Sequence, residues 1–191
     1  MKNRTLTLSI AVTAIVLLSL VIVQIIKLYI ASHFALNESH EITSWFWLCY
    51  IENNGMAFGL EWMPKFALTL FRLVAVVALS WYTHLLIRKP ETPVGYIITI
   101  AFIIAGAMGN IIDCVFYGKL FGYADWFYGK VIDMFYFPLI HNSAGEVIFF
   151  RPVFNFADSC ITVAVFVILF FYSKQLNTDF KKKEQEPAEE K

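Results

Sequence analysis

The sequence predicts an α-helical membrane protein with four transmembrane helices, a small β-rich outer loop and an interfacial segment in the second outer loop. Hydrophobic residues make up 59% of the 191 residues, charged residues make up 16%, and the mean hydropathy is +0.63. That balance is far more apolar than in soluble domains. We expect a single membrane domain over residues 1–176. Its spans are apolar segments long enough to cross a bilayer, at approximately 5–27, 66–87, 94–113 and 152–173.

The first apolar segment follows Lys2 and Arg4, so a cleaved secretory signal is the alternative to a retained helix. Its uncharged run, residues 5–26, is much longer than the roughly 7–15 residues of a signal-peptide core. No clear cleavage site follows it. We therefore expect a retained first span, with Lys27 at its far end reaching the polar interface through its long side chain.

The connection between the first two spans is polar and aromatic. Residues 42–51 are rich in β-branched and aromatic types, which predicts one or two short strands. Asn53-Asn54-Gly55 is a turn signal. In the longer connection, residues 115–151, we expect the aromatic part around 120–128 to lie in the membrane interface as a short amphipathic segment.

Charged and amide side chains inside the spans are the functional candidates, because ionisable groups are costly in a bilayer. Arg72 should either reach outward to the interface or pair with a carboxylate of the bundle. In the third span, the small residues Ala105 and Gly109 permit close helix packing. Asn110 and Asp113 follow, three residues apart and therefore on one helix face.

The fourth span begins with the same spacing. Asn155 and Asp158 are three residues apart, so they share a face if both are helical, and Pro152 suits the first turn of this helix. Beyond the span, residues 177–191 are charged and poor in apolar types. That composition predicts a disordered tail.

Basic residues predict the orientation of the four spans. One side of the membrane receives most of them: Lys2, Arg4, Arg88, Lys89, Lys174 and Lys181 to Lys183. The positive-inside rule makes this side cytoplasmic, with both termini on it and both long loops outside. Asp113, Asp133 and Asp158 then lie at or near the outer face.

The rest of the composition argues against several classes of function. A formal net charge of zero argues against a nucleic-acid partner. Cys49, Cys114 and Cys160 lack metal-ligand spacing and are interpreted as unpaired thiols, and the histidines are scattered, so no metal or cofactor is expected.

Carboxylates that are close together share a proton and can activate a water, as in aspartic peptidases.

Two functions of other classes compete with a peptidase. A small ion-coupled transporter would use intramembrane carboxylates, but we would expect them near the midplane of the membrane, with repeat symmetry between the halves. Here the acids cluster at one face and the halves look unalike. A scaffold subunit of a membrane complex would leave the recurring spacing of Asn and Asp unexplained.

The chain resembles the lipoprotein signal peptidases, also called signal peptidase II. The resemblance rests on four motifs in order: Gln24-Ile25-Ile26-Lys27, Glu52-Asn53-Asn54-Gly55-Met56-Ala57-Phe58, Gly106-Ala107-Met108-Gly109-Asn110-Ile111-Ile112-Asp113, and Gly129-Lys130-Val131-Ile132-Asp133 followed by Phe154-Asn155-Phe156-Ala157-Asp158. Each motif is weak alone. The ordered set on a four-span scaffold is specific, and it covers roughly residues 24–162.

The resemblance implies a membrane aspartic endopeptidase that removes the signal peptide from diacylglyceryl-modified prolipoproteins, cutting before the lipidated cysteine. Asp133 and Asp158 would be the catalytic dyad. Supporting or substrate-binding roles would fall to Asn53, Gly55, Asn110, Asp113, Asn155 and Lys27. The family requires no metal. Its partners are the prolipoprotein and membrane lipid, with no obligate protein partner, and its place is the bacterial cytoplasmic membrane with the site near the periplasmic face.

The sequence departs from the family pattern at four points, one of which is Met134, which follows Asp133 where the family commonly has Phe. Val23 stands where the family usually has Asp, and Cys114 where it usually has Arg. The gap between Asp113 and Asp133 is also longer than usual and contains Asp125. We assign the dyad to Asp133, because Gly-x-Val-x-Asp at residues 129–133 fits the motif and Asp125 has no such context.

Overall fold

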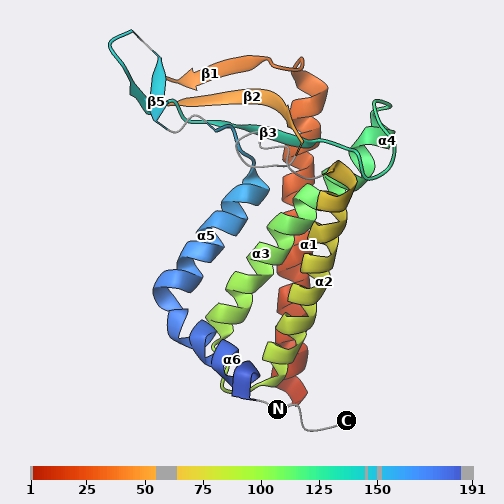
Figure 1. Ribbon diagram of the computed structural model, residues 1–191, viewed down its shortest axis with the longest axis vertical. Coiled ribbons are helices and arrows are strands. Elements are labelled where there is room, and N and C mark those ends of the chain that lie inside the picture. Colours follow the sequence, from red (N-terminus) through yellow and green to blue (C-terminus); the bar gives the residue numbers. More distant parts are fainter. Residues whose placement is uncertain (1, 55–63, 145, 150–151, 186–191) are drawn as a thin grey trace.

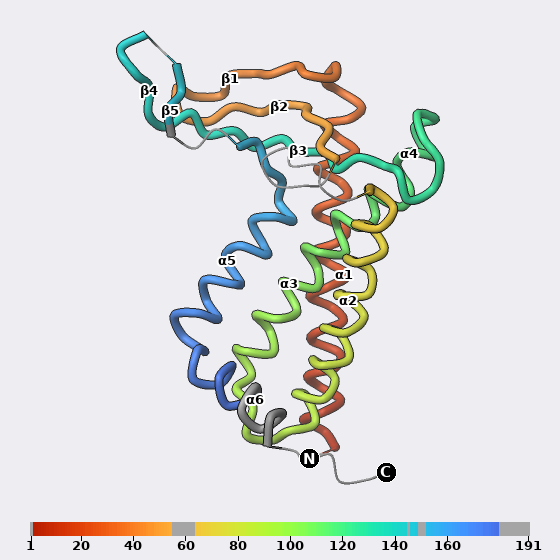
Figure 2. The backbone as a smooth tube through the Cα atoms, in the orientation of Figure 1, coloured from red at the N-terminus to blue at the C-terminus, as the bar shows by residue number. Residues whose placement is uncertain are grey.

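The computed structural model describes residues 2–54, 64–144, 146–149 and 152–185. A bundle of long helices carries a small β-sheet at one end, and the amino-terminal end lies at the other (Figure 1). The bundle consists of α1 (Lys2–His33), α2 (Lys65–Arg88), α3 (Val94–Ile112) and α5 (Phe156–Phe171). The same arrangement of helices and strands can be followed along the chain in Figure 2.

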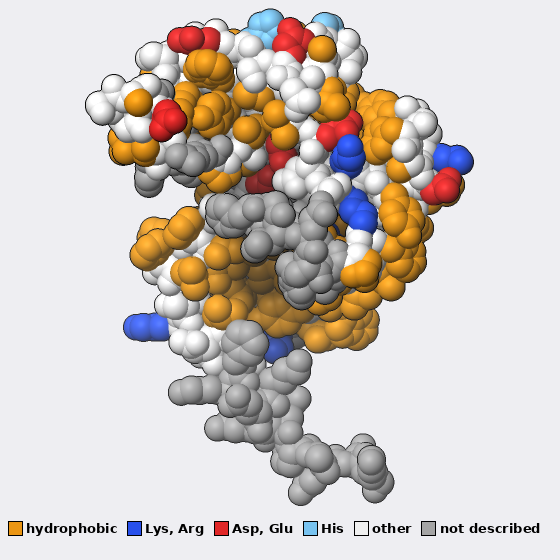
Figure 3. All heavy atoms as spheres, turned by 45° about the horizontal axis from the view of Figure 1, so that its top comes forward, with side chains coloured by type: hydrophobic (Ala, Val, Ile, Leu, Met, Phe, Trp, Pro, Cys, Tyr) orange, Lys and Arg blue, Asp and Glu red, His pale blue; other side chains and the backbone are white. Residues whose placement is uncertain are grey.

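Among the described residues, three helices are long and apolar enough to cross a membrane, or four if α5 and α6 (Ser173–Gln185) form one bent span. The first three contain the predicted spans, and α3 continues through a π-helical turn, η2 (Asp113–Tyr117), into α4 (Gly118–Leu120). Large apolar side chains point outward from the bundle, including Phe71 (64% exposed) and Phe170 (75%). Figure 3 shows hydrophobic side chains over the helices and charged ones mostly at the sheet end. The α-helical membrane class is confirmed.

The fourth predicted span begins later than expected. Pro152 precedes the helix instead of opening it, because Phe154 is held in an extended bridge with Phe135, with N···O distances of 2.7 and 3.0 Å. Asn155 is the N-cap, and α5 begins at Phe156. The prediction that Pro152 lies in the first turn is therefore wrong.

Residues 177–185, predicted as part of a disordered tail, belong to the helix α6. The chain bends by 86° between α5 and α6. Long-range contacts favour the helix: Leu176 packs against the core, and Asp179 accepts a hydrogen bond from Tyr82 Oη at 2.7 Å. Residues 186–191 lie outside the described part of the chain.

An antiparallel sheet in the order β1-β2-β3 lies over one end of the bundle (Figure 1). β1 (Ser39–Thr43) and β2 (Phe46–Asn53) confirm the predicted strands of the first connection. β3 (Val131–Tyr136) was not predicted. It pairs with β2 so that Ile51 lies opposite Asp133, which joins the two connections. A hairpin of β4 (Ile140–His141) and β5 (Val147–Phe149) follows.

The region expected in the interface contains α4 and turns, with exposed Leu120, Trp126 and Tyr128. Its position in a membrane stays a prediction. Of the three cysteines, Cys49 and Cys114 are buried and Cys160 is half-buried.

The core is centred on α3, which packs against the other long helices. A Cβ atom on Gly106 would lie 2.4 Å from the carbonyl oxygen of Ala157 in α5, and one on Gly109 would lie 3.0 Å from Val23 in α1. Small residues therefore let the three helices approach closely, as such residues do in membrane bundles. Asn110 follows in α3 and lies between α1 and α5, while Asp113, the first residue of η2, lies between α1 and β3.

Candidate active site

Asn155 connects the two carboxylates of the predicted dyad. As the N-cap of α5, its Oδ1 accepts a hydrogen bond from the backbone N–H of Asp158 at 3.1 Å, and Asp158 Oδ2 accepts one from the backbone N–H of Asn155 at 3.2 Å. This reciprocal arrangement is a capping box. The side-chain Nδ2 of Asn155 donates to Asp133 Oδ1 at 2.6 Å. Asn155 thus precedes the helix and does not share a helical face with Asp158.

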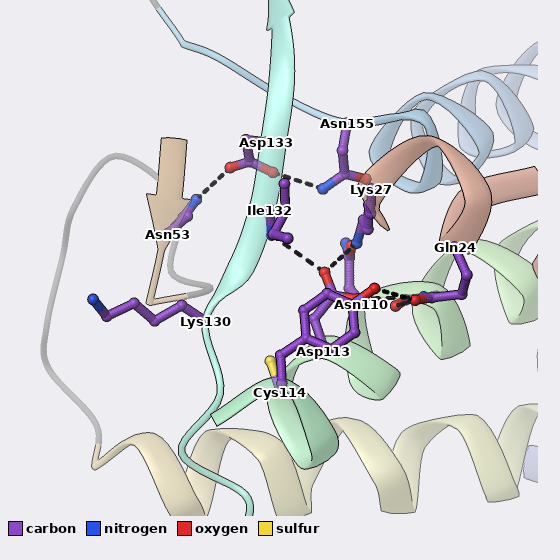
Figure 4. A network of polar contacts seen from close by, with 12 residues as sticks. Gln24, Lys27, Asn53, Asn110, Asp113, Cys114, Lys130, Ile132, Asp133 and Asn155 are labelled. Carbon is purple, nitrogen blue, oxygen red and sulfur yellow. Dashed lines mark hydrogen bonds and ion pairs between the residues drawn. The ribbon is translucent and has the colours of Figure 1, made fainter. Parts of the chain in front are cut away.

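Asp133 lies on β3 and is 2% exposed. Its Oδ2 accepts a hydrogen bond from Asn53 Nδ2 at 3.0 Å, so both of its oxygens face amide donors (Figure 4). Burial, and secondly the negative charge of Asp158, raise the pKa of Asp133 to about 6, although the hydrogen bonds from Asn53 and Asn155 act in the opposite direction. Asp133 is therefore the carboxyl suited to hold a proton.

Asp158, in the first turn of α5, also has both oxygens engaged. Its Oδ1 accepts a hydrogen bond from Asn110 Nδ2 at 2.7 Å, in addition to the backbone N–H of Asn155 on Oδ2. Asn110 Oδ1 in turn accepts from Lys27 Nζ at 2.8 Å. Because an ammonium group only donates, Lys27 fixes the amide of Asn110 with its donor side toward Asp158.

Lys27 and Asp113 form an ion pair inside the protein. Their side chains are 1% and 0% exposed, and Lys27 Nζ lies 2.5 Å from Asp113 Oδ2. Lys27 was predicted to reach outward to the interface, and that prediction is wrong: a buried carboxylate on α3 retains the ammonium inside, since buried charges need partners. Asp113 also accepts the backbone N–H of Ile132 at 3.2 Å and Gln24 Nε2 at 3.3 Å (Figure 4).

Sequence reasoning missed three contributors to this network. Gln24 was named only as part of a motif, yet its Nε2 also donates to the carbonyl of Gly109 at 3.0 Å, and its position three residues before Lys27 could have marked it. Tyr117 Oη donates to Gln24 Oε1. The backbone of Ile132 attaches β3 to Asp113, and the β-branched pair at 131–132 was the available signal for that strand.

The departures from the expected pattern are buried and apolar here. Val23 is 1% exposed and Cys114 is 0% exposed. Arg72 of α2 donates from Nη1 to Cys114 Sγ, with a distance of 3.5 Å. Although residue 114 is not arginine, a guanidinium from another helix therefore lies beside it.

Two other candidates stand apart from the network. Asp125 has an 82% exposed side chain and lies 3.4 Å from Lys119 Nζ. Gly55 lies outside the described residues. Within the described part of the chain, no group of three or more His, Cys, Asp or Glu is arranged to hold a metal ion. The structure thus joins Lys27, Asn53, Asn110, Asp113, Asp133, Asn155 and Asp158 into one polar network.

Known proteins match this chain over most of its length. The sequence profile of the family described as "Signal peptidase (SPase) II" matches residues 15–174. A "Lipoprotein signal peptidase" of Porphyromonas gingivalis is 39% identical over 190 residues, covering 87% of this chain and 84% of the relative. A protein with the same name from Chlorobaculum parvum is 34% identical over 137 residues, covering 71% of this chain and 77% of the relative.

Solved structures show the same fold. One described as a bacterial membrane enzyme solved at 2.3 Å by the in meso method has a TM-score of 0.65 at 22% identity, covering 95% of this chain and 94% of its own. A second, with the same description at 1.9 Å, has a TM-score of 0.62 at 24% identity, covering 83% and 90%. At these identities the likeness concerns the fold alone.

Proposed function

The chain belongs to the signal peptidase II family, and we propose that it removes the signal peptide from lipid-modified prolipoproteins by an aspartic mechanism with Asp133 and Asp158 as the dyad. One observation carries the assignment of the dyad. Asn155 contacts both carboxylates, through Nδ2 to Asp133 and through its backbone N–H and Oδ1 to Asp158. A separate β-strand and helix are thereby held together at one point.

The two carboxylates differ in a way that suits acid and base roles. Asp133 is buried and its pKa is raised to about 6, whereas Asp158 is only half-buried. In the proposed mechanism, Asp158 takes a proton from the attacking water while Asp133 donates its proton to the carbonyl oxygen of the scissile bond. The water oxygen bonds to the carbonyl carbon, giving a neutral tetrahedral diol.

The second half of the reaction returns both protons. The diol gives a proton back to Asp133, Asp158 transfers its proton to the leaving amine nitrogen, and the carbon–nitrogen bond breaks. The dyad is then in its starting protonation state. Asn53, Asn110 and Asn155 act as positioning residues in this scheme, because their amides hold the carboxylate oxygens without contacting the reacting bond.

The position of the dyad suits a lipid-anchored substrate. Asp158 lies in the first turn of α5, the apolar helix of the fourth candidate span, and Asp133 lies on β3 at the same end of the bundle. A substrate held in the bilayer by its diacylglyceryl group would present the bond next to the modified cysteine at that depth. We propose four spans in the bacterial cytoplasmic membrane, both termini cytoplasmic and the dyad near the periplasmic face, in line with the basic residues.

A cleavage assay on a diacylglyceryl-modified prolipoprotein tests the proposal. Asp133→Asn and Asp158→Asn should each abolish release of the signal peptide, because each removes a proton-transfer group, while the exposed Asp125 gives the matched control, Asp125→Asn, which should cleave at the wild-type rate. The dyad is wrong if either of the first two variants stays within a few-fold of wild type. Cleavage lost in Asp125→Asn alone would transfer the role to that residue.

A further inference from the structure

Helix α6 leaves the bundle at a right angle. α5 ends at Phe171, and the axis turns by 86° before α6 continues from Ser173. A helix perpendicular to a membrane span runs along the plane of the membrane. α5 has 16 residues, which corresponds to about 24 Å of helix, whereas the hydrocarbon core of a bilayer is about 30 Å thick. Because α6 is polar and follows directly from this end of α5, the headgroup layer is the part of a bilayer that suits it.

Contacts with the bundle hold α6 in this direction. Asp179 accepts a hydrogen bond from Tyr82 Oη of α2 at 2.7 Å and another from Gln175 Nε2 at 3.2 Å. Leu176 packs against the hydrophobic core around α3, and the ring centroids of Tyr172 and Tyr96 lie 5.6 Å apart. The face of α6 toward the bundle is thus occupied, and the carboxylate of Asp179 is engaged there.

Lysine is the commonest residue type of α6, and Lys174 is exposed. Lys174, Asn177 and Thr178 are exposed in the described part of α6. The sequence of the helix has four lysines, Lys174 and Lys181 to Lys183, against Asp179 and Glu184. Arg88 and Lys89 are exposed where α2 ends, at the same end of the bundle (Figure 1). Basic residues at a membrane surface attract anionic lipid, each one strengthening binding about fivefold.

We propose that α6 is an interfacial helix that binds anionic phospholipid headgroups in the leaflet at this end of the bundle. The argument requires that α5 crosses the membrane, but it does not depend on the catalytic dyad. Anchoring α6 in this way would hold the end of α5 at the level of the headgroups and keep its first turn, with Asp158, at a constant depth on the opposite side.

Hydrogen–deuterium exchange of the full chain in lipid nanodiscs tests this. Amides of residues 173–185 should exchange about tenfold more slowly in phosphatidylglycerol-containing discs than in phosphatidylcholine discs, and the difference should shrink at 1 M salt, where the Debye length is about 3 Å. Replacing the lysines together, Lys174→Gln, Lys181→Gln, Lys182→Gln and Lys183→Gln, should remove the difference while prolipoprotein cleavage continues. The variant Asp179→Ala removes the hydrogen bond from Tyr82 but keeps the lysines, and it should speed exchange in both kinds of disc.

Equal exchange rates in the two lipids would overturn the proposal, because α6 would then be held by Tyr82 and the core alone. A lipid difference that survives the lysine replacement would also overturn it. Dyad variants that still cleave would refute the proposed dyad without changing the lipid effect, so failure of one proposal is distinguishable from failure of the other.

Discussion

Asn155 has two physical tasks that substitution can separate. Its Oδ1 caps α5 by accepting the backbone N–H of Asp158, and its Nδ2 donates to Asp133. Serine is about as good an N-cap as asparagine, whereas alanine costs about 1 kcal/mol at that position. Asn155→Ser therefore keeps the cap and removes the amide donor, while Asn155→Ala removes both.

The magnitudes follow from these contacts. A buried hydrogen-bonding group left without its partner costs about 1–3 kcal/mol, so loss of the Asp133 contact should lower kcat/KM about 5- to 150-fold in both variants. Only Asn155→Ala should lose a further ~1 kcal/mol of unfolding free energy. Asn155→Asp keeps cap and size but replaces the donor by an acceptor beside Asp133, and we expect at least as large a loss of activity.

A pH profile of prolipoprotein cleavage adds an independent measurement. Burial and the charge of Asp158 raise the pKa of Asp133 to about 6 even though the hydrogen bond from Asn155 lowers it. Removal of this hydrogen bond in Asn155→Ser should therefore shift the limb of the kcat/KM profile near this pH toward higher pH. If Asn155→Ser cleaves within about threefold of wild type with an unmoved limb, Asn155 acts only as a helix cap.

Three further predictions concern stability and assembly of the site. Lys27→Met should cost about 3–5 kcal/mol of unfolding free energy by leaving Asp113 buried without its partner, and adding Asp113→Asn should recover most of it, measured as thermal unfolding in detergent. Gly129→Ala should lower both folding yield and cleavage, because a Cβ atom there would lie 2.1 Å from the carbonyl oxygen of Asp113. Finally, the pKa of Asp133 is about 6 in the folded protein and 3.8 for an ordinary carboxyl group. The proton on Asp133 therefore stabilises the folded state fully below pH 3.8, and this stabilisation, about 3 kcal/mol, is lost as pH rises through 6. The unfolding free energy of wild type should fall over this range, and that of Asp133→Asn should not.

Patterns in the local sequence predicted the helices and strands that can be recognised from contiguous residues. Long, mainly apolar runs identified α1, α2 and α3, and β-branched and aromatic residues identified β1 and β2. The start of α5 was misplaced, since Pro152 favours a first helical turn while the bridge from Phe154 to Phe135 keeps the backbone extended. That bridge depends on β3, whose partner strand is far away in sequence. Composition could not reveal such pairing.

Long-range polar contacts account for the other errors. Lys27 has the sequence position of a residue that reaches outward, and only the placement of Asp113 on the adjacent helix shows why it stays inside. The composition of residues 177–185 gives no reason to expect a helix there, but Tyr82 and the core hold α6 on the bundle. In each case the interacting residue lies on another helix, far away in the sequence, so the local sequence does not reveal the contact.

The gap between Asp113 and Asp133 is longer than the family pattern predicts, and the structure shows how the chain accommodates it. After Tyr117 the chain turns away through α4 and returns, with Phe127 N–H donating to the carbonyl of Val115 at 3.1 Å and Gly129 N–H to that of Cys114 at 2.9 Å. The additional residues therefore form a loop whose two ends are held together by these hydrogen bonds. From Gly129 onward, β3 is aligned by contacts independent of loop length: Ile132 N–H binds Asp113, and Asn155 binds Asp133. Because the motif glycine lets the returning strand touch the end of α3, the spacing that matters is measured through space and not along the sequence.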